Sequence, residues 1–409
     1  MKLTRKKVAI FVDSRKESGG AYQEVLNFLR NIKKYNQDNI EFLIICTSRK
    51  LNLKLEDQNL ELHYFSMNVL ERWICYLRNF GPFVRRIKKY FFIKNKFENF
   101  LKRINVDLVF FAGPSQYSLY LEDTKFFITI PDVDHRENIE FPEIVDTAEF
   151  HRKDEIFQKA LPKAIAVITN AQILKERISF FYGVLEKRIF IINFQPSSGV
   201  DNFKGINLAK QKKTRESLKL PKNYIFYPAV RHPHKNHRNL VDALKILRSK
   251  FKIDLQMVFC GGDTAYTGSL KEYINNQDLN DHILFLDFVE NDILPYLYLD
   301  AFIMVMPSLI GPTNIPPWEA FKTGTPAIYS ELEGIKDVLG DAVYYIDPLD
   351  PNSIAKGIKE IYENKELRNK LIISGKKRLN EIKARNEFKQ FFEIIKRFRK
   401  IRSIWEFNN

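Results

Sequence analysis

The sequence predicts an α/β protein with two domains, and three features of the chain support this prediction. Its 409 residues are 45% hydrophobic with only 16 Gly and 17 Pro, which is ample material for folded cores of about 100–200 residues each. In both halves, short apolar runs alternate with helical patterns, as in parallel sheets that are covered on both faces. A break at 195–205 (QPSSGVDNFKG) separates the two series, so we expect two α/β domains joined near residue 200.

Ten apolar runs, five on each side of the break, are expected to form buried strands. They are VAIFV (8–12), FLIIC (42–46), DLVFFAG (107–113), FFITI (126–130), AIAVIT (164–169), YIFYPA (224–229), LQMVFCGG (255–262), HILFLDF (282–288), AFIMVMPS (301–308) and TPAIYS (325–330). A helix is predicted at 239–251, where Leu240, Leu244 and Leu247 share one face and Asn239 is placed to cap the start.

Charge and cysteine content limit what the protein binds and where it works. Lys and Arg number 65 against 50 Asp and Glu, and a net charge of +15 favours an anionic partner: nucleic acid, phospholipid headgroups or a phosphorylated substrate. Cys46, Cys75 and Cys260 are widely spaced and odd in number, which disfavours a zinc site or disulfide framework and favours a reducing compartment. The chain lacks an apolar run of the roughly 18 residues that span a membrane, and its apolar start is too short for a signal peptide. We expect a cytoplasmic protein.

Two basic, aromatic segments stand out from the strand–helix alternation. Residues 386–407 predict a basic amphipathic helix that folds back against the rest of the chain. Residues 67–104 interleave Arg and Lys with Phe, Tyr and Trp. That pattern fits helices lying on an anionic membrane, helices whose aromatic sides face the core, or a surface that stacks single-stranded nucleic acid. We favour the core interpretation and keep membrane contact as the main alternative.

Ligands of open parallel sheets bind beyond the carboxyl ends of the strands, so the residues that follow each predicted strand are the candidate ligand contacts. Gly19 and Gly20 precede a helix whose first N–H groups can receive an anion, although a flexible turn explains a Gly pair equally well. Neither GxGxxG nor GxxxxGK(S/T) occurs. Their absence removes support for dinucleotide-dependent oxidoreductases and P-loop proteins.

A polar cluster of Asp132, Asp134 and His135 follows the predicted strand at 126–130. Two carboxylates suggest a metal site, but no third ligand is evident and we predict none. A general base, or an Asp/His pair that binds a hydroxyl group, fits these residues better.

The loop after the strand at 224–229 gathers cations just ahead of a helix, where the helix dipole disfavours them. A bound anion would offset this cost, and a diphosphate is the natural candidate. The cations are Arg231, Lys235 and Arg238, and His232, His234 and His237 lie among them.

Two further strand ends carry candidate ligand contacts. Gly261 and Gly262 suit the close approach of a phosphate, or a simple strand-to-loop turn. Glu319 follows a Gly/Pro-rich turn whose N–H groups can bind sugar hydroxyls. Its carboxylate can accept two hydrogen bonds from a vicinal diol, but the helix dipole alone also stabilises a Glu in a first turn.

Together these segments resemble the retaining, nucleotide-sugar-dependent glycosyltransferases of the GT-B fold, in the group 1 (family 4) class. The resemblance is strongest from Tyr224 to about Asp350, including PSLIGPTNIPPWEAFKTGTPAIYS and LGDAVYYIDPLDPNSIAKGI. It implies two Rossmann-like domains facing across a cleft. The implied parts are 1–198, an acceptor-side domain; 199–385, a nucleotide-sugar-binding domain; and 386–409, a C-terminal basic amphipathic helix packing back on the N-terminal domain.

The resemblance also implies roles for single residues. Lys235 matches the family's diphosphate-binding lysine and Arg231 its companion arginine, while Asp132 and His135 are the acceptor-side candidates. From the motifs and the resemblance together, the residues expected at the donor are Gly19, Gly20, Gly261, Gly262, Thr313, Asn314, Ile315 and Glu319. No metal or other cofactor is expected, because in the family basic side chains and helix N-termini neutralise the leaving diphosphate.

Two positions depart from the family's pattern. Gly311 stands where most members have the first glutamate of an E-x7-E element, and we interpret this as altered sugar recognition. Arg231 lies four residues before Lys235, whereas the family's arginine commonly lies five before. His232 and His234 are therefore alternatives for the role of that arginine.

The sequence predicts a retaining, metal-independent glycosyltransferase acting in cell-surface polysaccharide or lipopolysaccharide synthesis. Its partners would be a nucleotide-sugar donor, a glycan or lipid-linked acceptor and an anionic membrane surface, at the inner face of the cytoplasmic membrane. Three alternatives stay open: a GT-B-like sugar-nucleotide epimerase, a basic nucleic-acid-binding protein and a non-catalytic binding module. The epimerase needs acidic residues that Gly311 does not supply, and no RNP, zinc or helix-turn-helix signature supports nucleic acid as a partner.

Overall fold

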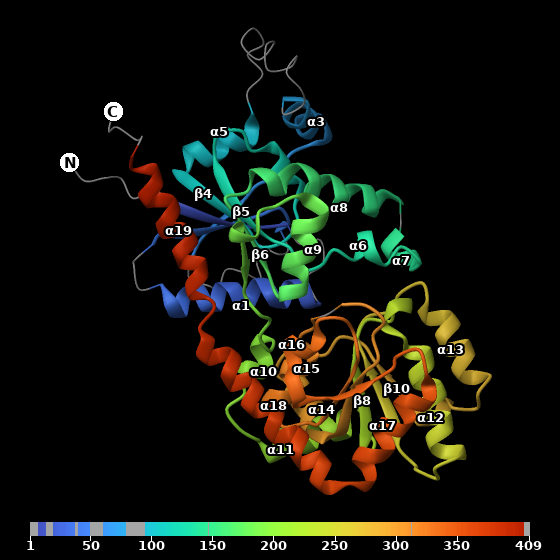
Figure 1. Cartoon of the computed structure of the whole chain (residues 1–409). Helices are drawn as coiled ribbons and strands as arrows, with labels where there is room; N and C mark the ends of the chain where they lie inside the picture. The colour runs from blue at the N-terminus through green and yellow to red at the C-terminus, as the bar shows by residue number, and fades with distance from the viewer. Residues whose placement is uncertain are drawn as a thin grey trace.

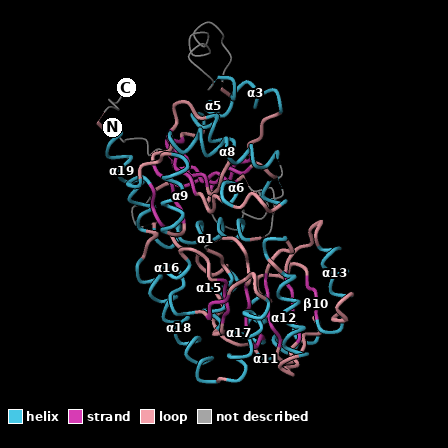
Figure 2. The backbone as a smooth tube through the Cα atoms, turned by 45° about the vertical axis from the view of Figure 1, so that its right-hand side comes forward, coloured by secondary structure: helices cyan, strands magenta, loops and turns pink. Residues whose placement is uncertain are grey.

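The computed structural model describes residues 7–13, 19–36, 40–49, 60–78, 95–145, 147–311 and 313–404. These residues form two α/β domains, each built on a parallel sheet with helices around it (Figure 1). Figure 2 shows the two sheets as separate groups of strands, one in each half of the molecule. The predicted class, α/β with two Rossmann-like domains, is confirmed.

In the described part of the chain, the N-terminal sheet has seven parallel strands in the order β3-β2-β1-β4-β5-β6-β7. They are β1 (Lys7–Val12), β2 (Phe42–Cys46), β3 (Glu61–Tyr64), β4 (Val106–Phe111), β5 (Lys125–Thr129), β6 (Ala166–Thr169) and β7 (Ile189–Ile191). The inner strands read as continuous apolar runs because helices cover both faces of the sheet. Strand order reverses between β1 and β4, and ligands of such sheets bind beside the carboxyl ends of this pair.

The C-terminal sheet repeats this topology with six parallel strands among the described residues, in the order β10-β9-β8-β11-β12-β13. They are β8 (Tyr224–Pro228), β9 (Gln256–Cys260), β10 (Ile283–Leu286), β11 (Ala301–Met306), β12 (Ala327–Ser330) and β13 (Tyr344–Ile346). Its order reverses between β8 and β11, which places the loops after these strands beside each other.

The helices follow the strands in regular alternation, and side-chain caps begin several of them. The side chains of Asn95, Asn207, Asp350 and Asn364 accept hydrogen bonds from first-turn N–H groups of α5, α11, α17 and α18. The helices of the N-terminal half are α1 (Gly20–Tyr35), α3 (Val69–Arg78), α5 (Lys96–Arg103), α6 (Asp134–Glu137), α7 (Pro142–Val145), α8 (Thr147–Ala160) and α9 (Gln172–Tyr182). Those that follow are α10 (Ser198–Asp201), α11 (Leu208–Ser217), α12 (His237–Ser249), α13 (Thr267–Asn275), α14 (Leu294–Asp300), α15 (Pro316–Thr323), α16 (Ile335–Leu339), α17 (Pro351–Glu363), α18 (Lys365–Arg385) and α19 (Lys389–Arg402).

The final helix, α19, returns from the C-terminal domain and lies along the N-terminal one (Figure 1, red). Asn386 has a left-handed φ of 47°, which ends α18 and turns the chain. The ring of Phe391 is fully buried, 4.9 Å from Phe110 and 5.2 Å from Phe127 between ring centroids. One apolar core therefore joins α19, α1 and one face of the N-terminal sheet.

The basic, aromatic segment at 67–104 divides into parts with different surroundings. In α5, Phe97 and Phe100 are buried, as the core interpretation predicts. In α3, by contrast, Val69, Leu70 and Trp73 are exposed by 75%, 69% and 60%. Residues 79–94 of this segment, and residues 405–409 at the C-terminus, lie outside the described residues.

Two details of the sequence-based prediction need correction. The strands β3, β7 and β13 were not predicted, because all three are edge strands of three or four residues with partly exposed faces. The cap predicted at Asn239 is wrong, since α12 begins at His237 and the Asn239 amide instead donates to the carbonyl of Pro348 at 2.9 Å. Within the described residues, no helix has the length and apolar character needed to cross a membrane.

Candidate active site

A cavity of about 550 Å³ lies between the two domains, at the carboxyl ends of their strands. The loops after β1 and β5 line it from the N-terminal domain, and the loops after β8, β9 and β11 line it from the other. Its volume falls within the range of about 300–1,000 Å³ that is typical of small-molecule sites. The residues singled out from the sequence that line it are Gly19, Gly20, Asp132, Asp134, His232, His234, Lys235, Gly261, Gly311, Thr313, Asn314, Ile315 and Glu319.

Lys235 lies in the short turn after β8, where the Tyr227 hydroxyl donates to its backbone carbonyl at 2.7 Å. The Lys235 ammonium donates to Asn314 Oδ1 at 3.3 Å and so points toward the loop after β11. Burial lowers the pKa of Lys235, whereas the carboxylates of Asp134 and Asp132 act in the opposite direction. The cavity thus contains a half-buried cation next to the residues expected to bind the donor.

Backbone N–H groups lie beside Lys235 where the chain enters α15. Thr313, Asn314 and Ile315 line the cavity, and no described residue accepts a hydrogen bond from their N–H groups. Pro316 and Pro317 carry no N–H, so these three groups are the last donors before the helix. Free N–H groups at a helix start favour an anionic ligand.

Gly311 lines the cavity with a left-handed φ of 91°. A side chain would be strained in this conformation, so the loop as it is folded here favours glycine at this position. The Gly311 carbonyl accepts hydrogen bonds at 3.2 Å from the Asn314 amide and from the Tyr329 hydroxyl.

Glu319 is 4% exposed and joins the C-terminal domain to the segment between the domains. One carboxylate oxygen accepts from the Tyr298 hydroxyl at 2.6 Å. The other accepts from the hydroxyl group and the backbone N–H of Ser197. Burial raises the pKa of Glu319, although these hydrogen bonds act against the rise. Oε1 already accepts both Ser197 bonds, whereas Oε2 accepts only the Tyr298 bond. Oε2 can therefore still accept one hydrogen bond from a ligand hydroxyl.

Three carboxyl groups of the N-terminal domain border the same cavity: Glu24, Asp132 and Asp134. Lys153, on α8, lies 3.5 Å from an Asp132 oxygen. Burial, and then the charge of Asp132, raise the pKa of Asp134 to about 7 and that of Glu24 to about 8. Groups that titrate near neutral pH can accept or donate a proton during a reaction.

Glu24 and Lys153 were not predicted from the sequence. Glu24 lies one helical turn after Gly20, which is the signal that would have found it, because that turn starts at the end of β1. The sequence gives no comparable signal for Lys153, because this residue lies in the middle of α8 and does not follow a strand.

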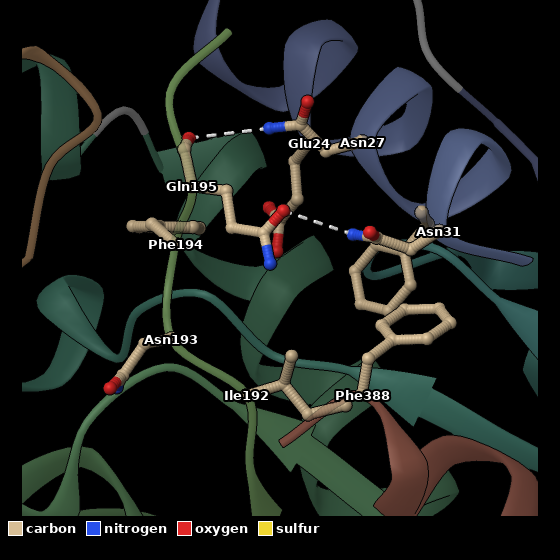
Figure 3. A pocket seen from close by; sticks show the side chains of 9 residues that line it. Glu24, Asn27, Asn31, Ile192, Asn193, Phe194, Gln195 and Phe388 are labelled. Carbon is tan, nitrogen blue, oxygen red and sulfur yellow. Dashed lines mark hydrogen bonds between the residues drawn. The ribbon is translucent and has the colours of Figure 1, made fainter. Parts of the chain in front are cut away.

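A second, much smaller cavity of about 20 Å³ lies beside the first and has room for about one water molecule. Glu24, labelled in Figure 3 with the other residues that line this small cavity, lines both cavities. The amides of Asn27 and Asn31 donate to the Gln195 carbonyl at 3.3 Å and to its Oε1 at 3.2 Å (Figure 3). These bonds hold the segment before the second domain against α1.

The structure corrects the expectation that Arg231 acts at the diphosphate. Arg231 is 1% exposed and does not line the cavity. Its guanidinium donates to the carbonyls of Gly261 and Leu286 at 2.5 and 2.9 Å, and to Asp263 at 2.7 Å. It therefore ties the carboxyl ends of β9 and β10 to the loop after β8.

His135 also lies behind the cavity wall, which corrects the expectation that it contacts the acceptor. It is 1% exposed, and its Nε2 lies 2.9 Å from the Tyr182 hydroxyl. Burial lowers the pKa of His135 to about 4. A ring that stays neutral and bonded to Tyr182 positions α6 against α8 and α9.

The two glycines after β9 have different surroundings. Gly261 lines the cavity, and a Cβ there would lie 2.5 Å from the Ala229 carbonyl oxygen, so glycine permits this close approach of two loops. Gly262 does not line the cavity and lies against the ring of Phe288, which corrects its assignment to the donor site.

Polar contacts cross between the domains around the cavity. The Thr313 hydroxyl donates to Asn170 Oδ1 at 2.7 Å. His234 Nδ1 lies 2.6 Å from Glu143 on α7, and burial lowers the pKa of His234 to about 4. Among the described residues, no group of three or more His, Cys, Asp or Glu side chains is arranged to hold a metal ion.

The sequence model of the family Glycosyl transferases group 1 matches residues 209–378. This part of the chain is a group 1 glycosyltransferase domain. The group 1 domain contains Lys235, Glu319 and the loop after β11, and the resemblance deduced from the sequence is confirmed for it.

A curated relative of the group 1 domain is the O-antigen chain mannosyltransferase RfbU of Salmonella typhimurium, 27% identical over 227 residues. The match covers 53% of this chain and 59% of RfbU, so the chain spans less than two thirds of that relative.

Two solved structures share the whole fold. A glycosyltransferase from Rickettsia africae has a TM-score of 0.69 at 17% identity, covering 96% of this chain and 100% of that protein. Anabaena HepE, solved with UDP-glucose, has a TM-score of 0.68 at 16% identity, covering 95% of this chain and 100% of HepE. The arrangement of two Rossmann-like domains across a cleft is thus the GT-B fold.

Proposed function

We propose that this protein is a glycosyltransferase that moves a sugar from a nucleotide-sugar donor to a glycan or lipid-linked acceptor. The observation that supports this most strongly is the placement of Lys235, Glu319 and the free N–H groups at 313–315 around one cavity between the domains. A cation and helix-start N–H groups suit a diphosphate, and the remaining acceptor site of the buried carboxylate suits one hydroxyl of a ribose. The presence of UDP-glucose in the HepE structure supports a nucleotide-sugar as donor.

The proposed reaction proceeds with retention at the anomeric carbon. The bond from that carbon to the diphosphate oxygen breaks, the bond to the acceptor oxygen forms, and the acceptor proton moves to the departing diphosphate. Lys235 and the N–H groups at 313–315 stabilise the negative charge that grows on the diphosphate. Asp132 borders the same cavity from the opposite domain and would bind an acceptor hydroxyl.

We propose that no metal takes part, because a diphosphate held by a cation and by helix-start dipoles needs no further countercharge. The test is to compare turnover after exhaustive chelation with turnover in added magnesium or manganese. Equal rates support the proposal, and activity that returns only with the metal contradicts it.

The product would be a cell-surface polysaccharide or lipopolysaccharide, assembled at the inner face of the cytoplasmic membrane. The name of RfbU, an O-antigen chain mannosyltransferase, supports this assignment. Exposed Val69, Leu70 and Trp73 on α3 offer an apolar contact for a membrane surface.

The decisive experiment replaces Lys235 by Ala. Loss of one group that stabilises the leaving charge costs about 2–4 kcal/mol, so we expect kcat to fall about 30- to 900-fold. Turnover would be measured over a panel of UDP- and GDP-sugars, with products identified by mass spectrometry. Arg238→Ala is the matched control, because Arg238 is an exposed cation three residues further along that does not line the cavity.

The same panel distinguishes the alternatives. A folded Lys235→Ala protein with normal turnover would contradict the proposal. A nucleotide-sugar epimerised without any acceptor would identify an epimerase instead. A nucleic-acid-binding protein would bind an oligonucleotide with steep salt dependence, whereas we expect UDP or GDP, and no oligonucleotide, to raise the melting temperature.

A further inference from the structure

A third cavity, of about 480 Å³, lies at the opposite edge of the N-terminal sheet from the candidate active site. It forms where α19 passes the amino ends of β5, β6 and β7, since its lining includes Lys125, Ala166 and Arg188 at or next to those ends. None of its lining residues belongs to the cavity between the domains. We call it the α19 groove.

The α19 groove combines an apolar wall with a basic rim. The apolar wall consists of Ala164, Ile165, Ala166, Phe190, Ile394, Phe398 and Ile401. The basic rim consists of Lys125, Lys163, Lys187, Arg188 and Arg397. Among the described residues that line the groove, none is acidic. This composition fits a ligand with an anionic head and an apolar body.

Three of the rim cations have no countercharge among the described residues. Lys125, Lys187 and Arg397 are exposed, and none of their side chains forms an ion pair or hydrogen bond with a described residue. Other cations nearby are paired: Arg402 lies 3.1 Å from Asp107. Like charges gathered around one opening repel one another, and a bound anion relieves that repulsion.

The groove is formed before any ligand arrives, because both ends of α19 are anchored. Phe391 packs in the buried core near the start of the helix, and Arg402 pairs with Asp107 at the end. Ile401, at the end of the groove's apolar wall, is exposed by 42%, and Ile404, three residues further along, is exposed by 73%. The apolar surface therefore continues outward from the groove.

We propose that the α19 groove binds one anionic phospholipid at a membrane surface. The lipid phosphate lies among Lys125, Lys187 and Arg397, and the first part of an acyl chain lies along Phe398 and Ile401. Inorganic phosphate would use the rim alone and leave the apolar wall in water, which is why a lipid fits better. The proposal does not rest on glycosyltransferase activity.

The first experiment uses the whole protein and a soluble short-chain lipid, dihexanoyl phosphatidylglycerol, below the concentration at which it forms micelles. Calorimetry should show saturable binding to a single site. Dihexanoyl phosphatidylcholine and inorganic phosphate should each bind at least tenfold more weakly. Phosphate that binds as tightly as the anionic lipid would overturn the proposal, as would an oligonucleotide that displaces the lipid.

The second experiment places the site by charge reversal. One Lys or Arg near an anionic surface raises the partition coefficient about fivefold. The double variant Lys187→Glu with Arg397→Glu removes two such cations. Its partition onto phosphatidylglycerol-containing vesicles should therefore be weaker by at least about 25-fold. Lys356→Glu with Lys377→Glu is the matched control, because these exposed lysines make the same charge change on α17 and α18. An equal loss in both double variants, or no loss in either, would overturn the assignment to this groove.

The apolar wall is tested separately with Ile401→Asp, for which Ile373→Asp on α18 is the control, since Ile373 is exposed by 68%. We expect Ile401→Asp to weaken binding of the short-chain lipid and Ile373→Asp to leave it unchanged. All variants are at exposed positions, and an unchanged melting temperature would show that they are folded. Wild-type affinity in Ile401→Asp would overturn the placement of the acyl chain.

Discussion

At the scale of single residues, the position of a side chain's charged group decides whether that group can bind a ligand or only stabilises the fold. Arg231 and Lys235 belong to the same basic loop, yet Lys235 points into the cavity while Arg231 is buried behind it. The Arg231 guanidinium satisfies two carbonyl groups and Asp263. Its chemistry as a phosphate-binding cation is therefore not available to a ligand, and its role is to hold three strand ends together.

We expect Arg231→Met to destabilise the C-terminal domain. Removing one partner of a buried charged network costs about 3–5 kcal/mol, because it leaves carbonyl groups unsatisfied. For a domain of this size the melting temperature should fall by about 6–20 °C. Calorimetry measures this fall, and turnover well below the transition should be largely kept. A protein of unchanged stability that has lost turnover would show instead that Arg231 acts on the substrate.

Glu24 should make stability depend on pH. The pKa of this group is raised in the folded protein to about 8 from an ordinary value of 4.5, mainly by burial and then by Asp132. The folded state thus binds the proton more tightly than the unfolded state, and the resulting stabilisation is complete below about pH 4.5 and is lost as pH rises to about 8. Glu24→Gln should flatten this fall in melting temperature between pH 5 and 9, measured against the wild type. A variant with the same pH profile as the wild type would contradict the raised pKa.

At the scale of elements, the inner strands were predictable because burial on both faces leaves a run of apolar residues. Edge strands have no such pattern: β3 and β13 are recognisable by their pairing with β2 and β12. The basic, amphipathic pattern of α19 predicts a helix and an apolar face. It does not say which surface covers that face, because the partner strands lie hundreds of residues earlier in the chain.

We expect Phe391→Ala to destabilise the N-terminal domain, although Phe391 comes after the C-terminal domain in the sequence. The ring is fully buried among Phe110, Phe127 and Phe388. Loss of a buried Phe ring costs about 3–5 kcal/mol. Urea unfolding would measure the change, with Phe180→Ala as control, since Phe180 is 82% exposed and should change stability by less than about 0.5 kcal/mol. Equal effects of both substitutions would contradict the packing of α19.

At the scale of the whole molecule, the candidate site exists only because two domains meet. Thr313 and Asn170, which are far apart in sequence, form a hydrogen bond of 2.7 Å across the boundary. Glu319 and Ser197 connect the group 1 domain to the segment that precedes it. Contacts of this kind set how often the domains are closed around a ligand.

Thr313→Val should therefore weaken donor binding. The substitution leaves the buried Asn170 Oδ1 without its donor in the closed form. This costs about 1–3 kcal/mol, which corresponds to about 5- to 150-fold in affinity. Calorimetric titration with UDP and GDP would measure this loss, and small-angle scattering would show a more open average shape. In a double-mutant cycle, adding Asn170→Ala to Thr313→Val should weaken donor binding little further. Fully additive losses of affinity would show that the contact between the two residues does not contribute to donor binding.

The sequence by itself determined the α/β class, the inner strands, the group 1 motifs and the gathering of polar residues at strand ends. These are local properties, since the pattern of burial along a strand and the loop that follows it lie in one continuous stretch of chain. The tertiary structure alone decided that Lys153 borders the cavity and that Arg231, His135 and Gly262 do not. It also decided where α19 packs and what its groove exposes. Which way a side chain points depends on neighbours from distant segments, and those neighbours meet only when both domains have folded.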